Sequence, residues 1–343
     1  MITGSGRRAS HKGVFVLCAL FLVSGCKAVH RAHANVHLDH DHATSTTMSN
    51  AEPETQDWAR QRLAKSPRHQ EWVKIKYKPA GGGPEREVNA FVVYPEVKKR
   101  TIAVLVIHEI FGMSDWVQGL TDQLAEAGYV AIAPDLLSGM GPHGGGTSDV
   151  ATAGANAIGG AIRDLPPNQI TADLNAVADY VSKLPAANGE VVAAGFCWGG
   201  GQTFRYATNN PALKAAFVFY GPPPLTGQPP ALPVDKTALG SIGAPVYGFY
   251  AENDARINAT LPATVDAMKD LKKQYEQVTY QGAGHGFMRA GEAPEPAAPV
   301  AKGTAEADKQ QTDEFQKALI SYKANKRARE EAWLRWKAIL AKI

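Results

Sequence analysis

The sequence predicts an α/β fold with a mostly parallel central sheet and helices on both faces. Short, continuous apolar runs, such as Thr101–Ile107 and 129–133, are typical of strands that are buried on both sides. Between such runs lie segments of helical period, such as 116–127 and 169–184. Strands that alternate with helices in this way usually pair in parallel, because each helix returns the chain to the same edge of the sheet.

The composition agrees with one large domain of this class. The chain has 343 residues, of which 44% are apolar and 20% are charged, so a disordered chain and a disulfide-stapled mini-protein are excluded. Arg7, Arg8 and Lys12 account for the formal charge of +3, because the other 33 basic residues balance the 33 acidic ones. A neutral chain creates no general field for nucleic acid, and we expect no nucleic-acid partner.

Residues 1–25 have the features of an export signal. A basic start precedes an apolar run over 14–23, which is too short to span a bilayer. The segment leads into Val23-Ser24-Gly25-Cys26, which resembles a bacterial lipobox, where the cysteine is acylated and becomes the mature N-terminus. We therefore expect a periplasmic or cell-surface lipoprotein that is anchored in the membrane through Cys26. The alternatives are plain signal-peptidase cleavage nearby and a short membrane anchor.

A His-rich, flexible tether is predicted over 26–52, where no apolar period is visible. Five of the ten histidines of the chain lie here, with Asp39 and Asp41 between them. Such a cluster could bind Zn²⁺ or Cu²⁺. A solvated polar spacer explains the composition without a metal, and no rigid ligand spacing is present. We predict neither a metal site nor an organic cofactor.

One domain is predicted over 53–325. It begins with a helix over 55–65 and a hairpin of strands over 71–77 and 88–94, joined by a turn rich in proline and glycine. The segment 139–160 is rich in Gly and Ala and weakly patterned, which predicts a mobile insertion. The other expected elements are strands over 101–107, 129–133, 191–194, 215–220, 245–250 and 277–281, and helices over 116–127, 169–184, 203–207 and 262–273.

An amphipathic helix is predicted at the C-terminus, over 326–343. Trp333, Trp336, Leu340 and Ile343 recur there at helical spacing, among many basic residues. Such a helix either packs on the domain or contacts a membrane or a partner. The pattern alone leaves both interpretations open.

A candidate nucleophile lies in the segment Gly195-Phe196-Cys197-Trp198-Gly199. It follows a predicted buried strand and precedes a predicted helix, which is the context of the nucleophile elbow. The flanking glycines allow a sharp turn that places Cys197 at the N-terminus of the helix. Free N–H groups and the helix dipole there favour a thiolate. The alternative is a cysteine that is simply buried in the core.

A thiol nucleophile needs a base, and the base needs an orienting acid. In this strand–turn–helix context the chain order is nucleophile, acid, base. Asp254 follows the strand over 245–250, and His285 lies in a glycine-rich loop after the strand over 277–281. No other histidine lies downstream of Cys197. Glu252 is an alternative for the acid.

Several motifs together resemble the dienelactone hydrolase family of α/β-hydrolases, over about residues 70–325. Besides the elbow, Asp254 and the segment Gly284-His285-Gly286-Phe287, they are His108-Glu109-Ile110-Phe111-Gly112 and Ala133-Pro134-Asp135-Leu136. The resemblance implies an α/β-hydrolase fold. It also implies that Cys197 is the nucleophile, His285 the general base and Asp254 its orienting partner.

The resemblance assigns further roles near the triad. Glu109 would pair with the resting cysteine and help to generate its thiolate, and Arg289 would hold a substrate carboxylate. The backbone N–H groups of Ile110 and Trp198 would form the oxyanion hole. The chain departs from the family at Gly286, where the family has serine. The family's second arginine and a tyrosine have no clear counterpart in 139–164, where Arg163 is only a guess.

The sequence therefore predicts a lipid-anchored hydrolase that cleaves a small ester or lactone through a cysteinyl acyl-enzyme. A general carboxylesterase or thioesterase is the alternative within the same class. A lipoprotein that binds metal through its tether and keeps an inactive hydrolase domain is the alternative from another class. The expected partners are the small-molecule substrate and the membrane that holds the N-terminal lipid.

Overall fold

The computed structural model describes residues 57–343, apart from 81, 155, 228–231, 292 and 300–302. The predicted export signal, the His-rich tether and Cys26 lie outside the described residues.

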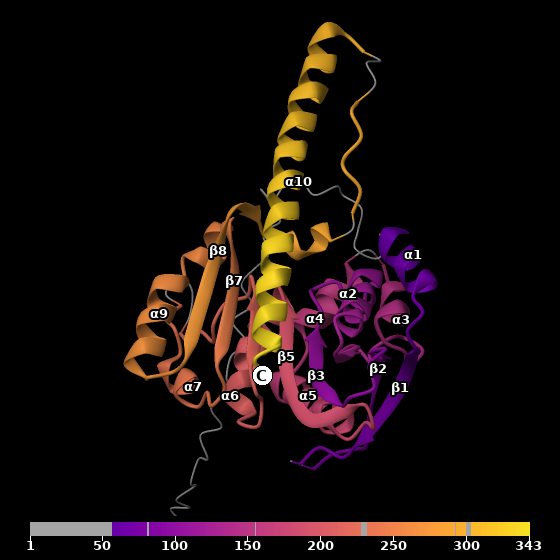
Figure 1. Cartoon of the computed structure of the whole chain (residues 1–343), viewed down its shortest axis with the longest axis vertical. Helices are drawn as coiled ribbons and strands as arrows, with labels where there is room; N and C mark the ends of the chain where they lie inside the picture. Colours follow the sequence, from indigo (N-terminus) through magenta and orange to yellow (C-terminus); the bar gives the residue numbers. More distant parts are fainter. Residues whose placement is uncertain (1–56, 81, 155, 228–231, 292, 300–302) are drawn as a thin grey trace, which may run out of the picture. The chain divides into compact units, whose positions relative to one another are not determined.

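An eight-stranded sheet, in the order β1-β2-β4-β3-β5-β6-β7-β8, forms the centre of the described chain (Figure 1). The strands β1 and β2 form the predicted antiparallel hairpin, and β2 is also antiparallel to β4. The other neighbouring strands are parallel, which confirms the predicted fold class. The strands are β1 (Gln70–Tyr77), β2 (Arg86–Val93), β3 (Thr101–Ile107), β4 (Val130–Pro134), β5 (Ala187–Phe196), β6 (Ala216–Phe219), β7 (Val246–Asn253) and β8 (Tyr275–Gly284).

Helices cover both faces of this sheet. On one face, Val104 and Val106 of β3 belong to a core with α2 (Asp115–Glu126) and the C-terminal helix α10 (Ala305–Leu340). On the other face, Leu105 and Ile107 of the same strand pack with α5 (Pro167–Ser182). Both faces of β3 are therefore buried, which explains its continuous apolar run. The remaining helices are α1 (Asp57–Lys65), α3 (Thr147–Ala151), α4 (Ala157–Arg163), α6 (Trp198–Asn209), α7 (Lys236–Gly240), α8 (Ala255–Asn258), α9 (Leu261–Asp270) and the 3₁₀ helix η2 (Phe287–Ala290).

The weakly patterned segment 139–160 contains structure that the sequence did not predict, namely α3 and the first part of α4. These helices are too short to show a clear period, but Val150 and Ile158 are buried. Two hydrogen bonds of Thr147 hold the segment in place. Its hydroxyl donates one to Asp135 Oδ1 at 2.8 Å and accepts one from the N–H of Met113 at 3.0 Å. The insertion is thereby tied to the loop that follows β3.

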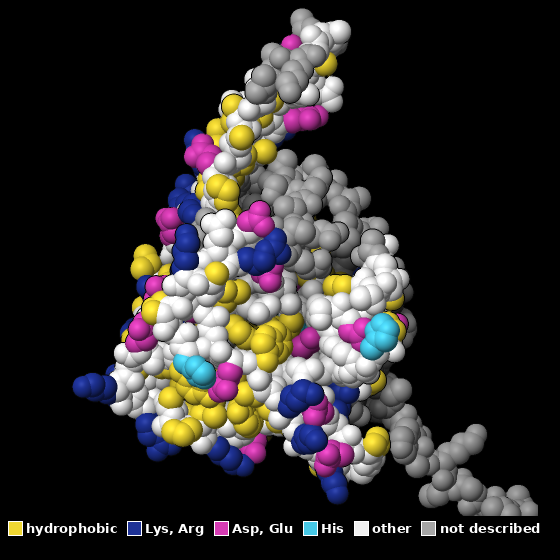
Figure 2. Space-filling view, turned by 90° about the vertical axis from the view of Figure 1, so that its right-hand side faces the viewer, with side chains coloured by type: hydrophobic (Ala, Val, Ile, Leu, Met, Phe, Trp, Pro, Cys, Tyr) yellow, Lys and Arg dark blue, Asp and Glu magenta, His cyan; other side chains and the backbone are white. Residues whose placement is uncertain are grey.

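The C-terminal helix α10 is much longer than the predicted helix over 326–343. Its first half is rich in charged and glutamine residues, so it lacks the apolar signal that marked the second half. Trp336 is fully buried with its ring centroid 5.0 Å from that of Phe219, whereas Ile343 is 39% exposed. The second half therefore packs on the domain, and the first half extends beyond it (Figure 1). Hydrophobic side chains also lie on the surface of the extended part (Figure 2), and Ile320 is exposed.

Within the part of the chain that the structure describes, no helix is both long enough and apolar enough to cross a bilayer.

Candidate active site

Cys197 occupies a strained turn between β5 and α6. Its backbone has φ 56° and ψ −118°, a region that non-glycine residues rarely adopt, and its N–H donates to the carbonyl oxygen of Phe219 at 3.1 Å. A Cβ at Gly195 would overlap the backbone of Gly199, and a Cβ at Gly199 would overlap the carbonyl oxygen of His108. The two glycines are therefore required by close backbone packing. The resulting elbow leaves Cys197 a free thiol that is 7% exposed.

His285 and Asp254 lie side by side, and like Cys197 they are at the carboxyl ends of the parallel strands. Asp254 follows β7 and His285 follows β8, and the carboxyl ends of parallel strands meet at one edge. The Nδ1 atom of His285 lies 2.5 Å from Asp254 Oδ2. Glu252, the alternative acid, instead accepts a hydrogen bond from the N–H of Gly282 at 2.7 Å. The geometry thus favours Asp254 as the partner of His285.

The charges around His285 raise its affinity for a proton. Burial opposes the protonated form, but the charge of a Cys197 thiolate and hydrogen bonds to Asp254 and Cys197 outweigh it. Together they raise the pKa of His285 to about 9. His285 therefore holds a proton most strongly while Cys197 carries a negative charge.

Glu109 and Arg289 form an ion pair in the site. Arg289 Nη1 lies 2.7 Å from Glu109 Oε2, and Glu109 is only 1% exposed. Burial opposes the charge of Arg289, yet the Glu109 carboxylate outweighs it and raises the arginine pKa. The resemblance assigned Glu109 to the resting cysteine and Arg289 to a substrate carboxylate. In the structure the two side chains pair with each other, so each buried charge is compensated.

Gly286, where the family has serine, has φ 80°, a left-handed conformation that glycine adopts without strain. In this structure the guanidinium of Arg289 lies where a Cβ at Gly286 would be.

Two amides are free where the oxyanion hole was predicted. Ile110 lies in the loop after β3 and Trp198 is the first residue of α6. Neither backbone N–H donates a hydrogen bond to another of the described residues. Both groups are therefore available to an oxygen that carries negative charge.

His108 supports the loop that carries these groups. Burial holds the pKa of His108 below its usual value, so the ring is neutral. Its Nδ1–H donates to the carbonyl oxygen of Glu109 at 2.8 Å, and its Nε2 accepts from the N–H of Leu136 at 3.3 Å. The ring also stacks on Trp198, with centroids 5.6 Å apart.

Tyr220 belongs to the site, although the sequence did not single it out. It follows β6 with φ 39°, and its ring centroid lies 5.0 Å from that of His285. Burial, and then the charge of Glu109, raise the pKa of Tyr220. Its hydroxyl and Glu109 Oε1 are both buried and neither makes a hydrogen bond. The signal that could have found it is a polar side chain directly after a buried strand at the active edge of the sheet.

Arg163, the candidate for the family's second arginine, is half-buried on α4. A Cβ at Gly159, in the same helix, would lie within 4 Å of both the Arg163 guanidinium and the side chain of Ile110. The insertion therefore borders the loop of Ile110, and among the described residues Arg163 forms no hydrogen bond or ion pair with Arg289, Cys197, Asp254 or His285.

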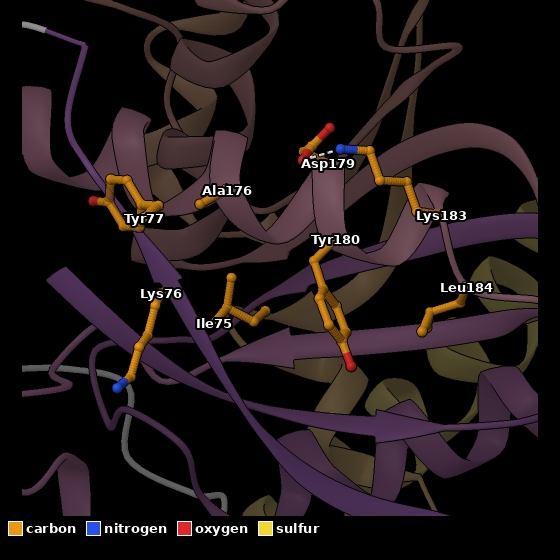
Figure 3. A pocket seen from close by; sticks show the side chains of 8 residues that line it. All are labelled: Ile75, Lys76, Tyr77, Ala176, Asp179, Tyr180, Lys183 and Leu184. Atoms are coloured by element: carbon orange, nitrogen blue, oxygen red, sulfur yellow. Dashed lines mark hydrogen bonds and ion pairs between the residues drawn. The ribbon is translucent and has the colours of Figure 1, made fainter. Parts of the chain in front are cut away.

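A pocket lies away from these residues, between β1 and α5, where Ile75 and Tyr77 face Tyr180 (Figure 3). Because β1 and β8 are at opposite edges of the sheet, this pocket is separate from the triad.

Among the described residues, no group of three or more His, Cys, Asp or Glu side chains could hold a metal ion.

Comparison with known proteins identifies the family of this chain. The family model described as "Dienelactone hydrolase family" matches residues 88–343. The chain belongs to the dienelactone hydrolase family.

Relatives of this dienelactone hydrolase family member include bacterial and archaeal proteins named "putative carboxymethylenebutenolidase". The protein from Salmonella typhi is 35% identical over 189 residues, which cover 54% of this chain and 67% of that protein. The one from Saccharolobus solfataricus is 29% identical over 291 residues, 75% of this chain and 95% of its own. A solved structure of a "putative dienelactone hydrolase" from Klebsiella pneumoniae covers 74% of this chain and 98% of its own, with a TM-score of 0.53 and 26% identity.

Proposed function

We propose that this protein hydrolyses a small carboxylic ester or lactone through a cysteinyl acyl-enzyme. The observation that carries the proposal is the hydrogen bond between His285 and Asp254 beside the Cys197 elbow. The free N–H groups of Ile110 and Trp198 support it. The membership of the dienelactone hydrolase family agrees with ester or lactone bonds as the target.

In the first half-reaction the Cys197 thiolate attacks the carbonyl carbon and a carbon–sulfur bond forms. The carbonyl oxygen becomes an oxyanion that the N–H groups of Ile110 and Trp198 stabilise. When this intermediate collapses, the carbon–oxygen bond breaks and His285 donates its proton to the leaving oxygen. Asp254 holds the ring through Nδ1, so Nε2 is the atom that faces the reaction.

In the second half-reaction His285 becomes a base. The acyl-enzyme has no thiolate charge, so the strongest cause of the raised His285 pKa is gone. The neutral ring takes a proton from water, and the hydroxide attacks the thioester. The thiolate leaves, and the product is a carboxylic acid.

The ion pair between Glu109 and Arg289 favours a substrate that carries a carboxylate. Such a substrate would compete with Glu109 for the Arg289 guanidinium. A Glu109 side chain released in this way is a buried carboxylate close to Cys197, and it could accept the proton of a neutral thiol. An anionic lactone would then activate the nucleophile as it binds.

We further propose that the protein is exported and held at a membrane through an acylated Cys26. The support is the basic and apolar pattern of residues 1–25 and the lipobox-like segment that ends at Cys26.

The direct test is a substrate panel of anionic lactones, neutral aryl esters and thioesters with the purified protein. We expect turnover of the lactones, and a mass increase on Cys197 that equals the acyl group when the reaction is quenched with acid. Turnover without any acylated Cys197 would contradict the covalent mechanism. Turnover of thioesters alone would favour the alternative function.

A further inference from the structure

Side chains of α10 bind the backbone on both sides of His285. The strand β8 is at the edge of the sheet and has only β7 as a neighbour. On such a strand, alternate N–H and C=O groups point away from the sheet and need other partners. For two of these groups, the Gly284 N–H and the Gln281 C=O, the partners are side chains of α10.

The hydrogen bond closest to His285 involves Asn325. The N–H of Gly284, the last residue of β8, donates to Asn325 Oδ1 at 2.8 Å. Gly284 directly precedes His285, so this bond fixes the peptide from which the histidine extends. Asn325 is polar and only 1% exposed. Its neighbours on the buried face of the helix, Ala328 and Ala332, are apolar.

The adjoining side chains bind the same loop. Arg327 Nη2 donates to the carbonyl oxygen of Gln281 at 3.1 Å, before His285 in the chain. The Tyr322 hydroxyl donates to the carbonyl oxygen of Ala293 at 2.8 Å, and Lys326 Nζ donates to that of Gly291. The backbone at Gln281 and Gly284 before His285, and at Gly291 and Ala293 after it, is therefore held by side chains from fewer than two turns of one helix.

We propose that Asn325 is a positioning residue for His285, and that side chains of residues 322–327 of α10 hold the backbone on both sides of this histidine. Asp254 fixes the ring of His285 at Nδ1, and Asn325 fixes the backbone behind it. Both are needed because a base displaced by about 1 Å can lose up to ~100-fold in rate. This role rests on the proposed function, in which His285 is the acid and base.

The test compares Asn325→Leu with Asn325→Asp in the full chain, with 4-nitrophenyl acetate as the substrate. The leucine removes the acceptor and leaves the Gly284 N–H unpaired, whereas the aspartate keeps an oxygen at the same place. We expect Asn325→Leu to lower kcat by about 10- to 100-fold with KM nearly unchanged, and Asn325→Asp to restore most of it. The matched control is Gln316→Leu, at an exposed position of the same helix, which should not change kcat.

Thermal unfolding of each variant separates positioning from general stability. Asn325→Ala removes the same acceptor with a smaller side chain and serves if the leucine variant does not fold. A folded Asn325→Leu or Asn325→Ala protein with wild-type kcat would overturn the proposal, as would an Asn325→Asp protein as impaired as the leucine variant. Turnover in Cys197→Ala would instead refute the proposed function, so the two failures are distinguishable.

Discussion

Cys197 follows a central strand of the sheet, whereas His285 follows its edge strand. The cysteine elbow is held by backbone contacts between segments that are themselves buried, and glycines make these contacts close enough. The histidine loop is held by side chains from a helix about 40 residues farther along the chain. Cys197 is thus fixed by the sheet, whereas His285 depends on a separate helix that docks against it.

Loss of the nucleophile has the largest expected effect. Cys197→Ala should lower kcat by about 10⁴-fold or more, since the members of a triad act as a unit. The smaller side chain fits the same elbow, so circular dichroism and thermal unfolding should match the wild type. Wild-type turnover in the folded variant would contradict the proposed mechanism.

The backbone packing of the elbow is tested by Gly199→Ala. The added Cβ overlaps the carbonyl oxygen of His108, so strand β3 or helix α6 must shift. We expect a loss of about 2–5 kcal/mol in the free energy of unfolding, measured in urea, and at least a ~100-fold loss of kcat. The matched control is Gly160→Ala in α4, where a Cβ meets no atom within 4 Å. That variant should be as stable as the wild type or slightly more so.

The ion pair between Arg289 and Glu109 joins the two regions, because Arg289 follows His285 and Glu109 follows β3. Arg289→Ala should raise KM for an anionic lactone by roughly 10- to 150-fold, the value of a charge-assisted hydrogen bond. A neutral aryl ester should be affected much less. Equal effects on both substrates would show that Arg289 only neutralises Glu109 and does not bind substrate charge.

The pH dependence of stability tests the contact between Cys197 and His285. The pKa of His285 is about 9 in the folded protein and near 6.5 in an unfolded chain. A raised folded pKa adds stability that is complete below pH 6.5 and is lost as the pH rises through 9. We expect the free energy of unfolding in urea to fall by on the order of 1–3 kcal/mol over this interval.

The same titration of stability in Cys197→Ala identifies what raises the pKa of His285. Without the thiolate charge, the pKa of His285 should lie lower and the decrease in stability should be smaller. An equal decrease in both proteins would assign the raised pKa to Asp254 alone.

The smallest effect on catalysis is expected from Cys26→Ser. The residues of both regions lie between 108 and 327, far from Cys26 in the chain, and we expect kcat and KM not to change. The variant should, however, appear in the soluble fraction after cell disruption, whereas the wild type should sediment with membranes. A variant that stays with membranes after a high-salt wash would place the anchor elsewhere, with the exposed C-terminal end of α10 as the first candidate.

The sequence by itself determined the fold class, the elbow and the order of the triad residues. Each of these depends on a local pattern. Apolar runs mark strands buried on both faces, and the glycines around Cys197 mark a turn that only small residues allow. His285 was identified because the chain has no other histidine after Cys197. Such signals need no knowledge of distant contacts.

Only the tertiary structure decided how these residues are held. Glu109 and Arg289 are 180 positions apart, and no sequence period shows that they form an ion pair. Tyr220 and Asn325 carry no motif either; their roles follow from a buried hydroxyl beside Glu109 and a carbonyl group that meets the edge of β8. The physical reason is that burial forces each polar group to find a partner, and the fold decides which group is near enough to be that partner.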